Sequence, residues 1–365
     1  MKAISIIPRS TQVSLVDIEE PDVNAPDEVK LKVIQVGICG TDREEVSGGR
    51  ADAPPGKDRL VIGHEMFGQV VATGKDVRSI KAGDYGVVMV RRGCGKCIAC
   101  KNERSDMCYT GNYTERGIKG ADGFQAEYVV DKEKYVVKVP AAMKEIGVLT
   151  EPMSIVSKAI DEALTVQQSR LKFDINENWF NGKRALVAGI GAVGLMAAFA
   201  LRLRGVKLTG MDIVDEESAR PTILKQIGGE YIDGRNVSVN DIDKTCGEFD
   251  FIFEATGIPS LQFNLIDALA VNGLYLVSGI PSSTSTIRLP AADLLQQLVL
   301  KNQVILGCVN ASHHHYKIAV DDLSRIIEKW PDAIRSVITE QVPFSNFEKA
   351  LHHHSAEEIK VVVQW

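Results

Sequence analysis

The first 150 residues alternate apolar and polar positions in the two-residue rhythm of β-strands. The segment Val29–Ile34 alternates residue by residue, which is typical of a strand with one buried face. Apolar runs at Phe67–Ala72 and Tyr85–Val90 predict further strands, and glycines and prolines separate such runs. This part of the chain therefore predicts a β-barrel-like domain that carries long loops.

From Arg184 onward, the pattern changes to alternating strands and helices. A short apolar strand is predicted at Ala185–Ala188, an apolar helix over Leu195–Leu201, and a second strand over Lys207–Met211. Three more apolar runs continue the series at Phe249–Phe253, Leu274–Val277 and Val304–Gly307. This alternation predicts an α/β fold, in which helices cover both faces of a doubly wound parallel sheet.

Two segments connect these patterns. Apolar residues at helical spacing predict a helix over Ile155–Val166, between the β-rich part and the α/β part. The last fifty residues return to short strands and helices and end in an apolar strand at Ile359–Val363. We therefore expect the C-terminal segment to rejoin the first domain.

Composition and charge exclude several classes of partner. The chain has 365 residues, 45% of them hydrophobic and 25% charged, which suits a globular protein of two domains. Its net charge is -6 and it has no basic tract, so neither nucleic acid nor an anionic membrane is expected as a partner. No apolar run reaches transmembrane length, and the first eight residues are too short for a signal peptide. The expected location is cytoplasmic.

Four cysteines form a closely spaced quartet within fifteen residues. They are Cys94, Cys97, Cys100 and Cys108, in the pattern C-x2-C-x2-C-x7-C. Thiolates at two-residue gaps can turn back on one ion, and four of them close a tetrahedral zinc site with no open position. Disulfides are the alternative, but these gaps suit a metal better and no secretory feature supports oxidation. The quartet therefore predicts a structural zinc.

A glycine motif follows the strand predicted at Ala185–Ala188 and opens the next helix. It reads Gly189-Ile190-Gly191-Ala192-Val193-Gly194. In this setting Gly189 permits a tight turn, Gly191 lets the backbone approach a pyrophosphate, and Gly194 allows close packing of helix on strand. The N-terminus of the helix would offer free N–H groups to the phosphates.

The residue after the second strand indicates which dinucleotide is preferred. Asp212 lies about twenty residues beyond the glycines, where a carboxylate accepts hydrogen bonds from a ribose 2′-hydroxyl. A carboxylate there repels a 2′-phosphate, and the neighbours Ile213 and Val214 supply no cation. NAD is therefore favoured, with NADP a possible cofactor.

Two further residues could bind a metal. Cys39 lies between glycines in Gly37–Asp42, and His64, the only histidine before residue 313, follows an apolar run. Neither residue has a sequence neighbour at metal-ligand spacing, and a lone histidine is more often structural than a ligand. Only the fold can pair them.

These motifs, in this order, resemble the zinc-containing medium-chain alcohol and polyol dehydrogenases. Within that family, the chain looks like the glucose 1-dehydrogenase branch, best known from archaea. The segments that carry this narrower resemblance are Gly37–Glu44, Arg91–Gly95, Glu115–Ile118, Asp122–Phe124 and Gly307–Asn310. The resemblance implies a GroES-like β-barrel catalytic domain over residues 1–182, with the zinc lobe at 91–110. It further implies a Rossmann NAD-binding domain over 183–308 and a return to the catalytic domain over 309–365.

The resemblance also implies roles for particular residues. Two zinc ions are expected per chain, and the ligands of the catalytic one are Cys39, His64, Glu65 and Glu151, the two glutamates binding directly or through water. Thr41 would pass the hydroxyl proton toward solvent, and the catalytic set is Thr41, Glu65 and Glu151. The substrate contacts would be Thr41, Glu115, Glu151 and Asn310. The cofactor contacts would be Gly189, Gly191, Ala192, Val193, Gly194, Asp212, Thr256, Ser278 and Asn310.

The activity implied is oxidation of an aldose, glucose or a close epimer, at C1 to the lactone, with hydride transfer to NAD(P). Homotetramers or homodimers are expected from the same resemblance. Val90, Ile155 and Leu300 stand where members of the branch can carry polar sugar contacts, namely asparagine, aspartate and histidine. An NAD-dependent polyol or secondary-alcohol dehydrogenase is therefore the alternative enzyme. A catalytically inactive nucleotide-binding protein is the alternative from another class.

Overall fold

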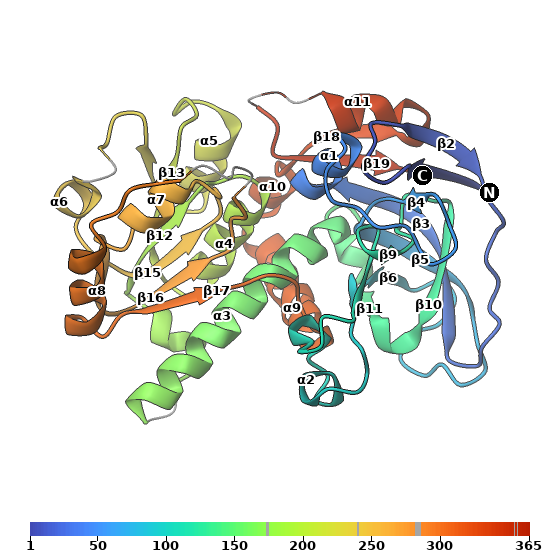
Figure 1. The fold of residues 1–365 in the computed structure, drawn as a ribbon, viewed down its shortest axis with the longest axis horizontal. Coiled ribbons are helices and arrows are strands. Elements are labelled where there is room, and N and C mark those ends of the chain that lie inside the picture. The colour runs from blue at the N-terminus through green and yellow to red at the C-terminus, as the bar shows by residue number, and fades with distance from the viewer. Residues whose placement is uncertain (173–174, 239–240, 282–285, 354, 356) are drawn as a thin grey trace. The chain divides into compact units, whose positions relative to one another are not determined.

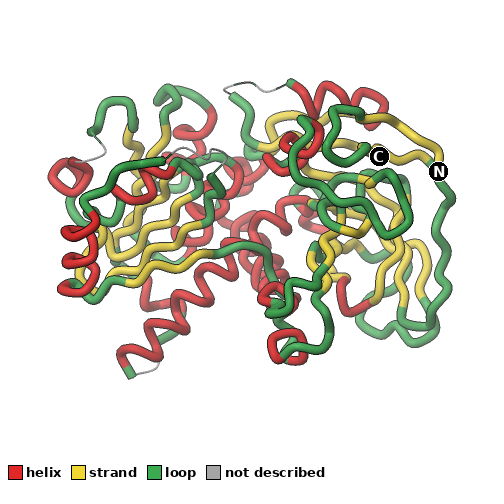
Figure 2. The backbone as a smooth tube through the Cα atoms, viewed as in Figure 1, coloured by secondary structure: helices red, strands yellow, loops and turns green. Residues whose placement is uncertain are grey.

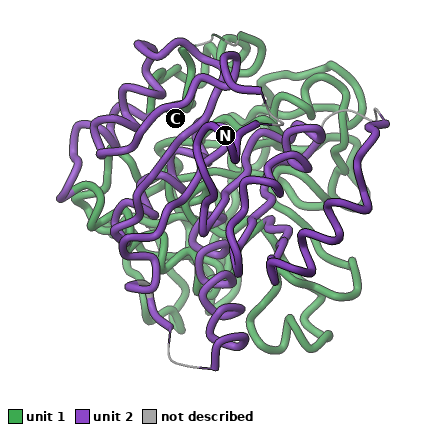
Figure 3. Tube along the Cα trace, turned by 90° about the vertical axis from the view of Figure 1, so that its left-hand side faces the viewer, with its two compact units in different colours: residues 1–154, 310–327, 338–365 green, residues 155–309, 328–337 purple. Residues whose placement is uncertain are grey.

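The computed structural model describes residues 1–365 apart from 173–174, 239–240, 282–285, 354 and 356 (Figure 1). The chain forms two compact units, coloured separately in Figure 3. The first contains residues 1–154, 310–327 and 338–365, and the second contains residues 155–309 and 328–337. Of the segment expected to return to the first domain, residues 310–327 and 338–365 lie in the first unit and residues 328–337 in the second, and residues 155–182, expected in the first domain, lie in the second unit.

The first unit is built on β-sheets. Its main sheet has the strand order β11-β6-β5-β3-β19-β18, and β10 also pairs with β3. These strands are β3 (Glu28–Ile38), β5 (Glu65–Thr73), β6 (Tyr85–Val88), β10 (Tyr128–Lys132), β11 (Val136–Val139), β18 (Ile338–Pro343) and β19 (Lys360–Gln364). The predicted alternation is confirmed in β3, whose residues Val29, Leu31 and Val33 are fully buried in one hydrophobic cluster.

Smaller elements complete the first unit. One three-stranded sheet joins β2 (Val13–Asp17), β1 (Lys2–Ile6) and β4 (Leu60–Val61), and another joins β7 (Arg91–Arg92), β8 (Thr114–Arg116) and β9 (Gly120–Ala121). The helices are α1 (Gly40–Val46), α2 (Ile98–Lys101), α11 (Phe347–His352) and most of α9 (His313–Lys329). Helix α3 (Thr150–Leu171) begins in the first unit and continues into the second.

The second unit is a parallel α/β sheet, as the sequence predicted. Its strand order is β14-β13-β12-β15-β16-β17, and every neighbouring pair is parallel. The strands are β12 (Arg184–Ala188), β13 (Lys207–Asp212), β14 (Glu230–Asp233), β15 (Phe249–Glu254), β16 (Leu269–Val277) and β17 (Val304–Gly307). The chain order reverses between β12 and β15, and ligands of such sheets bind outside the carboxyl ends of the strands at this point.

Helices line this sheet (Figure 2). They include α4 (Ala192–Leu203), α5 (Ala219–Gln226), α6 (Ile242–Cys246), α7 (Pro259–Asn264), α8 (Ala291–Leu300) and α10 (Pro331–Arg335). Residues Ala185–Ala188 of β12 and Gly194–Leu201 of α4 are all buried, which explains why both segments are apolar throughout. No helix in the described part of the chain is both long and apolar enough to cross a membrane.

Candidate metal and nucleotide sites

The four cysteines of the quartet converge on one point. One sulfur from each of Cys94, Cys97, Cys100 and Cys108 lies within 4.8 Å of all the others. Backbone N–H groups point at these sulfurs, since Cys97 N lies 3.4 Å from Cys94 Sγ and Cys100 N lies 3.5 Å from Cys97 Sγ. A Cβ atom on Gly93 would lie 2.4 Å from Cys100 Sγ, so the turn into the quartet requires a glycine.

The thiols differ in acidity because their surroundings differ. Hydrogen bonds from the Thr110 hydroxyl and from backbone N–H groups lower the pKa of Cys94 to about 5. Burial, with a smaller contribution from the neighbouring sulfurs, raises the pKa of Cys100 to about 12. Four thiolates this close repel one another, so a bound cation is what would let all of them ionise. Their spacing and convergence fit a closed Zn²⁺ site.

A second group of metal-ligating side chains assembles from distant parts of the sequence. Cys39 directly precedes α1, His64 follows β4, and Glu65 opens β5. One ligand atom from each of these three residues lies within 4.8 Å of the other two. His64 and Glu65 are 5% and 1% exposed, whereas Cys39 is half-buried. One thiolate, one imidazole and one carboxylate fit Zn²⁺ and leave room for a further ligand.

Strand pairing and two glycines bring this group together. β3 pairs with β5 so that Gly37 lies opposite Glu65. A Cβ atom on Gly37 would lie 2.1 Å from Glu65 Oε2, so only a glycine leaves space for that carboxylate. Gly63 has φ +87°, a conformation that favours glycine, and a Cβ there would meet Gln125 and Val36. The backbone therefore dictates where His64 and Glu65 lie.

Glu151 lies near this group but outside it. It is the second residue of α3 and is 7% exposed. Burial, with a further contribution from the charge of Glu65, raises the pKa of Glu151 to about 7. The three-residue group whose ligand atoms lie within 4.8 Å does not include Glu151. Direct ligation by Glu151 stays a prediction.

Glu115 and Asn310 are brought together in the first unit. Asn310 Nδ2 donates to Glu115 Oε1 at 2.8 Å. The same oxygen accepts from Arg91 Nε at 3.1 Å and from Arg91 Nη2 at 2.9 Å. Glu115 is 8% exposed, and Asn310 has φ +59°, which asparagine tolerates better than most residues. Two residues predicted to contact substrate are thus hydrogen-bonded neighbours, although 195 positions separate them.

The glycine motif has the geometry that nucleotide binding requires. Gly189 has φ +81°, and a Cβ on Gly194 would lie 1.8 Å from Gly189 O, so α4 packs closely on β12. A Cβ on Gly191, by contrast, would have no atom within 4 Å. The space beside Gly191, Ala192 and Val193, at the N-terminus of α4, is therefore open to a phosphate.

The other predicted cofactor residues lie at the carboxyl ends of neighbouring strands. Asp212 ends β13, Thr256 follows β15, and Ser278 follows β16. Thr256 Oγ1 donates to the buried Glu254 at 2.5 Å, and Ser278 N donates to Glu254 O at 2.9 Å. Asp212 Oδ2 accepts from Ile190 N at 3.0 Å, which ties the strand end to the glycine motif.

The chain was compared with known proteins. A family model described as "Glucose dehydrogenase C-terminus" matches residues 144–365, and one described as "Alcohol dehydrogenase GroES-like domain" matches residues 25–141. A glucose 1-dehydrogenase of Methanocella arvoryzae is 34% identical over 100% of this chain and 99% of that protein. The glucose 1-dehydrogenase 2 of Vulcanisaeta moutnovskia is 36% identical with the same coverage. The chain belongs to the glucose dehydrogenase family.

Solved structures agree with this family assignment. The glucose dehydrogenase of Haloferax mediterranei, solved in complex with NADP, Zn and gluconolactone, has a TM-score of 0.89 and 30% identity. The match covers 100% of this chain and 99% of that one. The predicted family and the predicted fold, a GroES-like domain with a Rossmann-type parallel sheet, are both confirmed.

Three residues of this glucose dehydrogenase family member were missed by the sequence analysis. Lys360, on β19, is 3% exposed, and its Nζ donates to Glu65 Oε1 at 2.8 Å, to Glu65 Oε2 at 2.6 Å and to Ile38 O at 3.1 Å. The sequence feature that could have identified Lys360 is its place inside the otherwise apolar run Ile359–Val363. A buried cation is rare unless it is paired.

Asp42 is the second missed residue. It is fully buried on α1, where Oδ2 accepts from Cys39 N at 2.8 Å and Oδ1 lies 3.5 Å from His64 Nδ1. Burial is the largest single effect on the pKa of His64 and would lower it, but the interactions with Asp42 and Cys39 together outweigh burial and raise that pKa well above its ordinary value. Because the Asp42 carboxylate lies on the Nδ1 side of the ring, Nε2 is the nitrogen that would bind a metal. The sequence feature that could have identified Asp42 is an acidic residue in the first helical turn after Cys39.

Arg220 is the third. It lies on α5, and its Nη1 is 3.4 Å from Asp212 Oδ2. The residues directly after Asp212, Ile213 and Val214, carry no positive charge. A cation does reach Asp212, from eight residues further on, because α5 packs back against the strand end. The charge that a 2′-phosphate would meet is therefore partly offset.

Proposed function

We propose that this protein oxidises an aldose, glucose or a close epimer, at C1 to the lactone, with zinc as metal and NAD(P) as hydride acceptor. The observation that carries the proposal is the convergence of Cys39, His64 and Glu65 in a chain that also has an open glycine motif. The names of the relatives and the Haloferax complex with NADP, Zn and gluconolactone support it.

The catalytic zinc would be held by Cys39, His64 and Glu65, with Glu151 as a further ligand, directly or through water. Zinc bound there would act as a Lewis acid and favour the ionised form of the substrate hydroxyl. Asp42 orients His64, and Lys360 holds Glu65 through both carboxylate oxygens. The second zinc would bind the four cysteines and hold their loop, because that ligand set has no open position.

Proton handling would fall to Thr41 and Glu151. Thr41 is half-buried in the first turn of α1, two residues after Cys39, and we assign it the transfer of the hydroxyl proton toward solvent. Glu151 is a buried carboxyl whose pKa of about 7 suits proton exchange near neutral pH. Glu65 completes the proposed catalytic set.

The sugar would be bound by Glu115 and Asn310, together with Thr41 and Glu151. The Glu115 carboxylate is fixed by Arg91 and Asn310, so its remaining oxygen is oriented without further ordering cost. We place the cofactor on Gly189, Gly191, Ala192, Val193 and Gly194, with Asp212 at the ribose and Thr256, Ser278 and Asn310 as further contacts. NAD is the proposed preference, and the Arg220–Asp212 pair supports tolerance of NADP.

The alternative activity is that of an NAD-dependent polyol or secondary-alcohol dehydrogenase. Val90, which is apolar and 3% exposed, directly precedes Arg91, the arginine that binds Glu115. Val90 and Ile155 offer no polar group to a sugar hydroxyl, which favours the polyol or secondary-alcohol activity. An inactive nucleotide-binding protein is disfavoured, since a protein without catalysis has no use for a metal group open to a further ligand.

We also propose a homodimer or homotetramer in the cytoplasm. Helix α8 exposes three large apolar side chains, Leu295, Val299 and Leu300, at 62%, 72% and 71%. The neighbouring edge strand β17 pairs on one side only among the described residues, and it exposes Ile305 at 40%. An apolar helix beside an open strand edge suits a second copy of the chain. Seven cysteines, none of them in a disulfide in this structure, suit a reducing compartment.

The test is a substrate panel with a matched variant. Initial rates of nicotinamide reduction should be measured for glucose, galactose, xylose, sorbitol and 2-propanol, with NAD and with NADP. Glu115→Gln should raise KM for aldoses about tenfold, because a charge-assisted contact is lost, and should leave 2-propanol unchanged. The proposal fails if sorbitol or 2-propanol exceeds every aldose in kcat/KM by more than about tenfold, a margin larger than one lost hydroxyl contact explains.

A further inference from the structure

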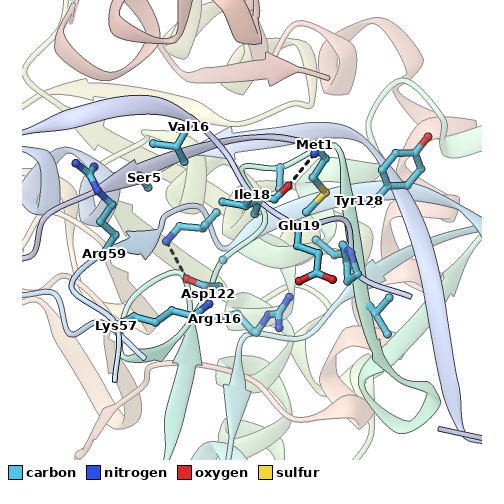
Figure 4. A pocket seen from close by; sticks show the side chains of 16 residues that line it. Met1, Ser5, Val16, Ile18, Glu19, Lys57, Arg59, Arg116, Asp122 and Tyr128 are labelled. Carbon is cyan, nitrogen blue, oxygen red and sulfur yellow. Dashed lines mark hydrogen bonds and ion pairs between the residues drawn. The ribbon is translucent and has the colours of Figure 1, made fainter. Parts of the chain in front are cut away.

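A cavity of about 350 Å³ lies within the first unit, on strand β8 and its neighbours (Figure 4). Its wall includes apolar side chains from β2, β4 and β10 and from the segment directly after β2, among them Val16, Ile18, Val61 and Val129. This volume is in the range of small-molecule sites. Neither metal-ligand group contributes a side chain to its lining, so it is separate from the proposed active site.

The charges around the cavity do not cancel. Lys57 Nζ pairs with Asp122 Oδ2 at 2.7 Å, so the charges of these two side chains neutralise each other. Arg116 lies 3.9 Å from Asp131, but Asp131 already binds Arg92 at 2.5 Å. The Nε atom of Arg116 is buried and has no hydrogen-bond partner in the described part of the chain.

The remaining charged side chains of the lining leave an excess of positive charge. Arg59 donates to the neutral Ser14 hydroxyl at 3.0 Å. Glu19 is exposed and forms no ion pair within 4 Å among the described residues, although Figure 4 shows it on the same side of the cavity as Arg116. Besides the Lys57–Asp122 pair, the lining therefore holds two guanidinium groups and one exposed carboxylate. A largely buried guanidinium with incomplete partners is costly, and an oxyanion beside it would recover much of that cost.

We propose that this cavity binds a small organic anion, with its oxyanion head on Arg116 and its apolar body against Val16, Ile18 and Val129. The same strand connects the cavity to the proposed substrate site. Side chains alternate along β8, so Glu115 faces Arg91 and Asn310 while Arg116 faces the cavity. Occupancy of the cavity is therefore transmitted to Glu115 through one peptide unit. The link to substrate rests on the proposed function, whereas the binding site does not.

The wall of the cavity is tightly anchored near the metal group as well. Gly123 N donates to Val61 O at 2.6 Å, and Val61 N donates to Asp122 Oδ1 at 3.0 Å. A Cβ on Gly123 would lie 2.4 Å from Gly63 O, directly before His64. A ligand that displaces this wall therefore displaces the backbone that leads into His64.

Benzoate and its neutral isostere benzamide test the charge requirement. Methyl NMR of the full-length protein with labelled isoleucine and valine should show saturable shifts at Ile18 and Val61 with benzoate, and Ile252 in the second unit is the reference. Benzamide should bind about tenfold more weakly, since it cannot form a charge-assisted pair with Arg116. Arg116→Met should weaken benzoate binding by a similar factor. Glu19→Gln, an exposed change that should leave the fold intact, should tighten it severalfold by removing an opposing charge.

Transmission is measured on the same samples, without any substrate. The side-chain amide of Asn310, which donates to Glu115, should shift on saturation with benzoate, while that of Asn236 in the second unit should not. The proposal is overturned if benzoate and benzamide bind alike, if Glu19→Gln fails to tighten binding, or if the Asn310 amide stays unchanged at saturation. None of these results depends on whether glucose is a substrate, so failure here is distinct from failure of the proposed function.

Discussion

The two metal-ligand groups of this protein are encoded in different ways. The cysteine quartet spans fifteen consecutive residues, and local turns with N–H groups aimed at sulfur bring it together. The group of Cys39, His64 and Glu65 exists only because β3 pairs with β5 and places Gly37 opposite Glu65. We therefore expect the quartet to need a metal to hold its loop, whereas strand pairing already positions the second group. Loss of ligands should therefore affect stability in the first case and chemistry in the second.

The largest effect should follow from His64→Ala. Removing one of three protein ligands should lower kcat by at least about a thousandfold, because the metal can no longer be held where it acts. Metal analysis should find one zinc per chain instead of two, and the melting temperature should change little. His352→Ala, at an exposed histidine of α11, is the control. Near-normal kcat in His64→Ala would show that the catalytic assignment is wrong.

Cys100→Ser should lower the stability of the protein and leave its activity largely intact, the opposite of His64→Ala. Loss of the quartet's metal should lower the melting temperature by about 10 °C, since metal binding there contributes to folding. Activity at low temperature should remain near that of the unmutated protein. Cys246→Ser, at a half-buried thiol outside the quartet, provides the matched control. An immediate loss of kcat with an unchanged melting curve would contradict the distinction between the two groups.

Lys360→Met sharpens the comparison by removing the cation beside Glu65. In metal-free protein this leaves a buried carboxylate without its partner, which should cost about 3–5 kcal/mol in the free energy of unfolding. Added zinc should recover most of this loss in the variant, because the ion replaces the lost positive charge. Denaturant unfolding with and without zinc measures both effects. Lys138→Met, at an exposed pair with Asp84, should cost less than about 1 kcal/mol.

The smallest effects should concern the preference between the two cofactors, which depends on Asp212 at the end of β13 and on its ion pair with Arg220. Asp212→Ala should narrow the preference for NADH over NADPH about tenfold, since a carboxylate facing a phosphate is removed. Arg220→Met should widen the preference severalfold by removing the charge 3.4 Å from Asp212. Equilibrium binding of NADH and NADPH measures these ratios without catalysis. A stronger affinity of the unmutated protein for NADPH would refute the proposed NAD preference.

Sequence patterns alone were sufficient for the parts of this protein that local structure encodes. The parallel sheet followed from alternating apolar runs and helices, and the glycine motif and the cysteine quartet followed from spacing, because each is completed within one turn or one strand–helix unit. The GroES-like domain and the roles of Cys39 and His64 required a family resemblance, since neither residue has a ligand neighbour in sequence. The family comparisons confirm the fold, while the individual roles stay predictions.

Only the tertiary structure revealed the contacts between residues far apart in the chain. Lys360 reaches Glu65 because β19 and β5 flank β3, and 295 positions separate the two residues. Asn310 reaches Glu115 across 195 positions, and even Arg220, only eight residues after Asp212, reaches it because α5 follows the strand end. Arg116 lines the cavity while Glu115 contacts Asn310, because successive side chains of β8 point to opposite faces. Apolar periodicity determines which face of an element is buried, but which polar groups then meet depends on how the elements pair.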